Sequence, residues 1–103
     1  MQRQFACKVD ELAVGTSMTV KAEPIAVALY RTAKHEFFAT ADTCTHEDWS
    51  LGSDSDLDGR EVVCPLHNAR FDIATGKPLC LPATLALQTF AVEVTGDDVY
   101  ILS

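Results

Sequence analysis

The sequence is short of basic residues and of long apolar runs, and each shortage excludes a class of protein. Eight Lys and Arg stand against 15 Asp and Glu, which gives a formal net charge of −7. Nucleic acid is held by clustered positive charge, so no nucleic-acid partner is expected. No stretch reaches the ~18 apolar residues of a membrane helix, and the first residues lack the apolar core of a secretory signal. We therefore expect a cytoplasmic protein with no membrane segment.

Cysteine is also scarce, with four residues in 103: Cys7, Cys44, Cys64 and Cys80. Four cysteines could form two disulfides, but nothing in the sequence indicates an oxidising compartment. In a cytosolic chain, Cys close to His more often binds a metal. Cys44 and Cys64 have such a His nearby, whereas Cys7 and Cys80 do not. We expect the latter two to be reduced thiols that pack as small hydrophobes.

The distribution of apolar residues predicts an all-β fold. They make up 48% of the chain, enough for one packed domain over residues 1–103, and they recur with a period of two rather than 3.6. A hairpin turn is expected at 95–98, and a short helical turn within 9–14. Many short strands between turns predict a small antiparallel β-sandwich or barrel. The predicted strands lie at residues 25–30, 36–40, 61–63, 90–94 and 99–101.

Two short segments carry the candidate chemistry. Cys44-Thr45-His46 is followed, after seventeen residues, by Cys64-Pro65-Leu66-His67, so each segment supplies one thiolate and one imidazole. Two such loops side by side would present two Cys and two His to one inorganic centre. A structural zinc site takes the same four ligands, but usually groups Cys with Cys and His with His. The mixed pairs suit a two-iron cluster in which two His replace two Cys on one iron. The residues alone leave both centres open.

The spacing Cys-x-His-x17-Cys-x2-His resembles the Rieske family, and residues 71–77 more narrowly resemble the ferredoxins of bacterial aromatic-ring dioxygenase systems. The resemblance spans nearly the whole chain. It implies one [2Fe-2S] cluster per chain, bound in a subdomain of two loops at about 43–49 and 63–71. It also implies that Cys44 and Cys64 hold the buried iron, and that His46 and His67 hold the outer iron.

The same resemblance implies a one-electron carrier between a flavin-dependent NAD(P)H reductase and a terminal aromatic-ring-hydroxylating oxygenase. An oxygenase would need a further iron held by two His and a carboxylate, and only His35 remains. We therefore expect an electron-transfer component and not an enzyme, working as a monomer. Respiratory Rieske proteins typically carry an extra Cys in each loop, where this chain has Trp49 and Leu66. The alternatives are a zinc-stabilised binding module and a small subunit of another redox enzyme, such as a nitrite-reductase-type complex.

The chain departs from its relatives close to the ligands. Family members often have Gly after each ligand His, where Glu47 and Asn68 stand here, so the loop backbones are expected to differ slightly. High-potential members carry a Ser and a Tyr that donate hydrogen bonds towards cluster sulfurs. Ala69 and Phe71 occupy those positions and cannot donate. We therefore expect a potential near the low end of the Rieske range of roughly −150 to +300 mV.

Four further features have a structural and a functional interpretation. Trp49 and Leu66 could pack beneath the loops or form an apolar rim around the cluster. Pro82 resembles the proline of a loop that covers a Rieske cluster, but could equally belong to an ordinary turn. The acidic run 54–59 resembles the start of a calcium loop, but the pattern then requires Glu where Pro65 stands, so we expect a solvated loop. His35 is expected to be a solvated residue at a strand end.

Overall fold

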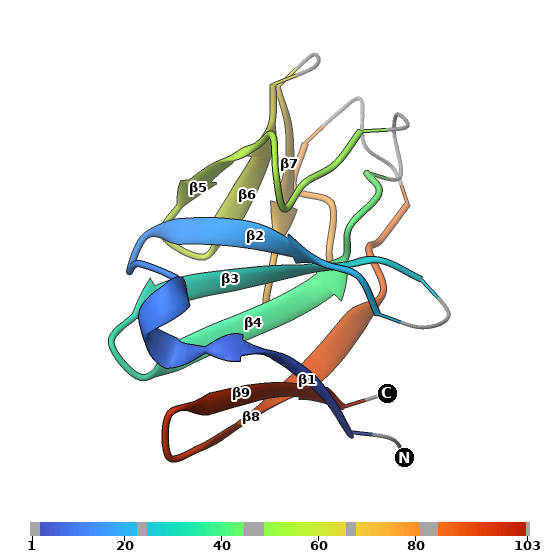
Figure 1. Cartoon of the computed structure of the whole chain (residues 1–103). Helices are drawn as coiled ribbons and strands as arrows, with labels where there is room; N and C mark the ends of the chain where they lie inside the picture. Colours follow the sequence, from blue (N-terminus) through green and yellow to red (C-terminus); the bar gives the residue numbers. More distant parts are fainter. Residues whose placement is uncertain (1–2, 23–24, 45–48, 66–67, 81–84, 103) are drawn as a thin grey trace.

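The regular secondary structure of the described residues is almost entirely β, as predicted. The computed structural model describes residues 3–22, 25–44, 49–65, 68–80 and 85–102, and Figure 1 shows two antiparallel sheets. The larger sheet has the strand order β1-β9-β8-β4-β3-β2, and the smaller has the order β5-β6-β7. Among the described residues, no helix is long and apolar enough to cross a bilayer. The elements are β1 (Arg3–Lys8), the 3-10 turn η1 (Val9–Glu11), β2 (Thr16–Val20), β3 (Val27–Ala33), β4 (Glu36–Ala41), β5 (Asp56–Asp58), β6 (Glu61–Cys64), β7 (Ala69–Asp72), β8 (Thr89–Thr95) and β9 (Asp98–Leu102).

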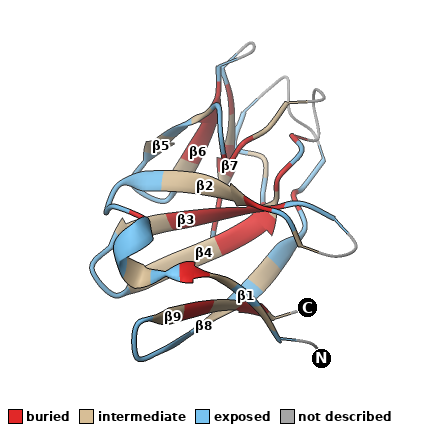
Figure 2. Ribbon diagram, viewed as in Figure 1, coloured by how far each residue is buried: buried red, intermediate tan, exposed pale blue. Residues whose placement is uncertain are grey.

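Strand β3 is buried on both faces at its start and separates two core clusters. Successive side chains of a strand point to opposite faces, so Ala28 and Tyr30 face one cluster while Val27 and Leu29 face the other. Figure 2 shows this run of buried residues at the centre of the molecule. The first cluster joins the larger sheet to the smaller one. It contains Ala28, Tyr30, Cys44, Leu51, Val62, Cys64, Ala69, Phe71, Ile73 and Leu87.

The strands predicted from alternation are confirmed, with small changes at their ends. The segment predicted at 25–30 begins later, at Val27, and the others fall within β4, β6, β8 and β9. Thr95 pairs with Asp98, which leaves Gly96 and Asp97 as the predicted two-residue hairpin turn. Gly96 has a φ of 60°, which suits the turns that favour tight hairpins. The helical turn expected within 9–14 is shorter and ends at Glu11.

Four strands were not predicted, and three of them, β1, β2 and β5, lack a clear apolar alternation. β1 and β2 are the two edges of the larger sheet, where polar residues are tolerated. β7 lies mostly within residues 63–71, which were predicted to be the second loop. The expected acidic loop at 54–59 was partly wrong, because Asp56–Asp58 form β5 and pair with β6. Its acidic side chains are exposed, as expected, so the strand is specified by its partner more than by its own pattern.

Candidate metal centre

The two cysteines predicted as ligands lie at the bases of two loops. Cys44 follows β4 and Cys64 ends β6, and both segments lie at the end of the molecule away from the two termini (Figure 1). Their exposed fractions are 3% and 0%, and both belong to the first core cluster. The chemistry of this donor set fits an iron–sulfur cluster, because thiolates are the ligands such clusters use.

Backbone contacts join the two ends of the first loop to each other. The Cys44 N–H donates to the Trp49 carbonyl at 2.9 Å, and Thr43 forms a β-bridge with Ser50. The Trp49 indole N–H donates to the Asp54 carbonyl at 2.7 Å, and its ring packs against the first core cluster. The packing interpretation of Trp49 is therefore supported. His46 and Glu47 lie outside the described residues.

The second loop is the tip of the β6–β7 hairpin. Cys64 pairs with Ala69 in register, so the connection between the two strands consists of residues 65–68. Asn68 has a φ of 56°, in the left-handed region that Gly adopts most readily and that Asn tolerates better than most residues. The replacement of Gly at position 68 therefore keeps a conformation that Gly would allow. His67 and Leu66 lie outside the described residues.

No group of three His, Cys, Asp or Glu forms a metal site within the described residues alone. Two of the four predicted ligands, His46 and His67, lie outside that part of the chain. The two predicted ligands that the structure does describe are the thiols of Cys44 and Cys64.

The other two cysteines differ from each other. Cys7 is buried in the second core cluster, as predicted, and burial raises the pKa of its thiol. The same prediction for Cys80 is wrong, because Cys80 is exposed and its thiol donates to the Asn68 carbonyl at 3.6 Å. Cys80 was expected to pack as a small hydrophobe because it lacks a nearby His, but Leu79 and Cys80 are both exposed. All four cysteines are described, and none forms a disulfide. Pro82 lies outside the described residues.

Sequence reasoning missed one buried carboxylate next to the first loop. Asp42 is 6% exposed and lies two residues before Cys44. Its Oδ1 accepts hydrogen bonds from the Thr19 hydroxyl and from the Gly52 N–H, each at 2.9 Å. Its carbonyl accepts from the Leu51 N–H at 2.8 Å. These bonds connect both ends of the first loop to β2. No sequence signal distinguished this Asp from the exposed ones.

The positions expected to govern hydrogen bonding to the cluster are both buried. Ala69 and Phe71 have exposed fractions of 0% and share the first core cluster with Cys44 and Cys64. A hydroxyl at either position would therefore be enclosed in the core cluster that also contains the two thiols. Neither side chain present can donate a hydrogen bond.

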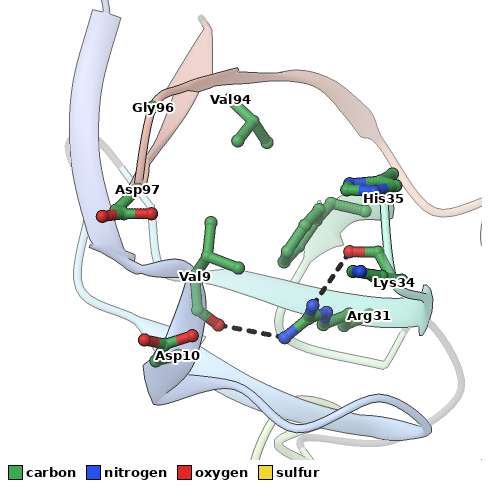
Figure 3. Close-up of a pocket in the computed structure, with 9 residues that line it drawn as sticks. Val9, Asp10, Arg31, Lys34, His35, Val94, Gly96 and Asp97 are labelled. Carbon is green, nitrogen blue, oxygen red and sulfur yellow. Dashed lines mark hydrogen bonds between the residues drawn. The ribbon is translucent and has the colours of Figure 1, made fainter.

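A cavity of about 290 Å³ lies among η1, the β3–β4 turn and the β8–β9 turn, away from both loops (Figure 3). Arg31 donates to the carbonyls of Val9 at 3.1 Å and Leu12 at 2.8 Å, and to that of Lys34 at 2.9 Å. Its guanidinium therefore ties the two turns together. His35 lines the same cavity and is exposed at a strand end, as predicted. The cavity contains neither of the described ligand candidates.

Comparison with known proteins gives consistent matches. Residues 2–91 match the family described as Rieske [2Fe-2S] domain. The chain is 40% identical over 101 residues to the 3-phenylpropionate/cinnamic acid dioxygenase ferredoxin subunit of Escherichia coli (strain K12), covering 98% of this chain and 93% of that protein. A ferredoxin structure from Sphingomonas yanoikuyae B1 has a TM-score of 0.90 and 31% identity over 99% of both chains. A chain from a complex of reduced oxygenase and oxidized ferredoxin in carbazole 1,9a-dioxygenase has a TM-score of 0.89 and 36% identity, covering 97% of this chain and 92% of that chain.

Proposed function

Since this chain belongs to the Rieske [2Fe-2S] domain family, we propose that Cys44, His46, Cys64 and His67 hold its [2Fe-2S] cluster. The chain is an electron-transfer component and not the catalytic one. We further propose that it passes single electrons from a flavin-dependent NAD(P)H reductase to a terminal aromatic-ring-hydroxylating oxygenase. The cluster supplies the one-electron chemistry, and the protein supplies its ligands and its surroundings. The proposal treats residues 1–103 as one domain, with cluster-binding loops at about 43–49 and 63–71.

The observation that carries the proposal is the burial of the two thiols at adjacent loop bases. Cys44 follows β4 of the larger sheet and Cys64 ends β6 of the smaller one, yet both lie in one apolar cluster. A thiolate in such a place is costly unless a metal compensates its charge. A pair of buried cysteines, each followed in sequence by a histidine, matches the donor set of a Rieske centre.

The proposed partners agree with the charge and the relatives. One similar ferredoxin has been seen in a complex with its oxygenase, and another is named as a dioxygenase subunit. A net charge of −7 favours brief docking on basic surfaces, as suits a carrier that must leave one partner before meeting the next. We also propose that the chain works in the cytoplasm, where NAD(P)H would supply its electrons, and that it is a monomer.

Metal analysis of the purified full-length chain tests the ligand set. We expect about two irons and two acid-labile sulfides per chain, with a red-brown colour. Cys64→Ser and Cys44→Ser should each lose the cluster, because each removes one thiolate from the same iron. Cys80→Ser is the matched control, since its thiol is exposed, and it should keep full iron content.

Two other results would contradict the proposal in different ways. One zinc per chain and no visible absorbance would identify the zinc-stabilised alternative. A folded chain without any metal would favour a structural small subunit of another redox enzyme. If Cys80→Ser lost the cluster while Cys64→Ser kept it, the assignment of the ligands would be wrong even with iron present.

A further inference from the structure

Asp42 is a buried carboxylate that has no cationic partner among the described residues. Its exposed fraction is 6%, and it forms no ion pair with any described Lys, Arg or His. Every ion pair that the described residues do form involves exposed side chains on other parts of the surface. Asp42 is thus the acidic residue that the core of the described chain encloses most completely.

Hydrogen bonds hold this carboxylate in place. The Thr19 hydroxyl and the Gly52 N–H both donate to Oδ1, so that oxygen is held as an acceptor by two hydrogen bonds. The Thr19 oxygen in turn lies 3.0 Å from the Ser50 hydroxyl and 2.6 Å from the Ser53 hydroxyl. This chain of hydroxyls fixes the orientation of Thr19 and keeps the carboxylate from turning towards water.

The position of the carboxylate relative to the first loop is equally fixed. Asp42 lies two residues before Cys44, and its carbonyl accepts the Leu51 N–H across the base of that loop. Gly52, which donates to the carboxylate, is packed tightly against β2. A Cβ at this position would lie 2.6 Å from the Met18 carbonyl oxygen. The Asp42 carboxylate is therefore held in one place, two residues along the chain from the proposed iron ligand Cys44.

We infer that Asp42 is a buried negative charge that lowers the reduction potential of the cluster; the inference rests on the proposed function. Reduction adds one electron, donated by the flavin of the proposed reductase, and it breaks no bond. A fixed negative charge opposes the arrival of that electron, and buried charges are screened by solvent and salt far less than surface charges. The net charge of −7 acts in the same direction but is mostly solvent-exposed, so Asp42 has the larger effect for a single residue.

Asp42→Asn is the direct test, because it removes the charge while its amide oxygen can still accept both hydrogen bonds. The reduction potential should rise by the equivalent of roughly a tenfold more favourable reduction, or about 59 mV for one electron. The rise should persist in about 1 M salt, where the Debye length is only ~3 Å. Asp10→Asn is the matched control, since it removes the same charge from an exposed residue on η1. Its effect should be less than twofold and should vanish in high salt.

Thr19→Val separates the charge from the hydrogen bonding. It removes a donor to Asp42 but keeps the carboxylate, so the potential should stay the same or fall. A rise equal to that of Asp42→Asn would overturn the inference, because loop geometry and not charge would then govern the potential. So would an Asp42→Asn potential no different from that of Asp10→Asn.

Loss of the cluster has a different meaning in the variant and in the wild type. If Asp42→Asn does not take up the cluster, Asp42→Ser removes the same charge and still offers an acceptor to Gly52, and its potential decides the question. If the wild-type chain itself binds no iron, the proposed function fails. A wild-type chain with a full cluster and an Asp42→Asn variant of unchanged potential would leave the proposed function intact and refute only the role of Asp42.

Discussion

Phe71→Tyr adds a hydroxyl to the ring that stands where high-potential Rieske proteins carry a donor. Phe71 is fully buried, pairs with Val62 on β6 and forms a β-bridge with Pro78. Its ring shares the first core cluster with Cys44 and Cys64. We expect the new hydroxyl to donate towards a cluster sulfur and to raise the reduction potential, because the reduced state carries more negative charge.

The magnitude follows from the enclosure of the ring. A buried hydroxyl without a partner costs about 1–3 kcal/mol of stability, and a hydrogen bond to a charged acceptor is worth about 1.5–3 kcal/mol. The free energy of unfolding should therefore change little if the sulfur accepts, and fall by at least about 1 kcal/mol if it does not. A bond that the reduced state accepts about 1.4 kcal/mol more strongly raises the potential by about 59 mV.

Protein-film voltammetry measures the potential, and denaturant unfolding measures the stability of the same variant. Phe90→Tyr is the control, because Phe90 is partly buried and packs against the second core cluster. Phe90→Tyr adds the same oxygen in a core cluster that does not contain Cys44 or Cys64, so it should leave the reduction potential unchanged. A folded Phe71→Tyr protein with an unchanged or lower potential would refute the reasoning that a missing donor keeps the potential low. A wild-type midpoint well above zero would refute it as well.

Two further predictions concern the supporting structure. Gly76→Ala should cost more than the ~1–2 kcal/mol of a left-handed conformation, since its Cβ would lie 2.0 Å from the Leu87 carbonyl oxygen. Gly59→Ala, with a similar φ and open space, should show only the conformational cost in denaturant unfolding; equal losses would contradict the clash. The Arg60 guanidinium, followed by the Thr32 hydroxyl, holds the pKa of Glu36 below its usual value of about 4.3. The stability from this pair is present above about pH 4.3 and is lost as the pH falls through the lowered pKa. Arg60→Ala should therefore be less stable than wild type at neutral pH. Its free energy of unfolding should then fall less than that of wild type as the pH is lowered, and parallel profiles of stability against pH would refute this.

Local sequence patterns determined the strands that are specified by their own side chains. Alternation predicted β4, β8 and β9, and Thr95–Asp98 predicted the hairpin turn, because these depend on neighbours a few residues apart. The ligand candidates could be found in the same way, since each cysteine lies within three residues of its histidine. Such patterns report only on residues that lie close together along the chain.

Burial and pairing between distant segments were decided only by the tertiary structure. β5 is acidic and becomes a strand because β6 pairs with it, while Cys7 and Cys80 both lack a nearby His in sequence but have opposite exposure. Asp42 is buried because Thr19, 23 residues earlier, and Gly52, ten residues later, both donate to it. The burial of a polar group depends on partners brought together by the whole fold, and no window along the chain contains them.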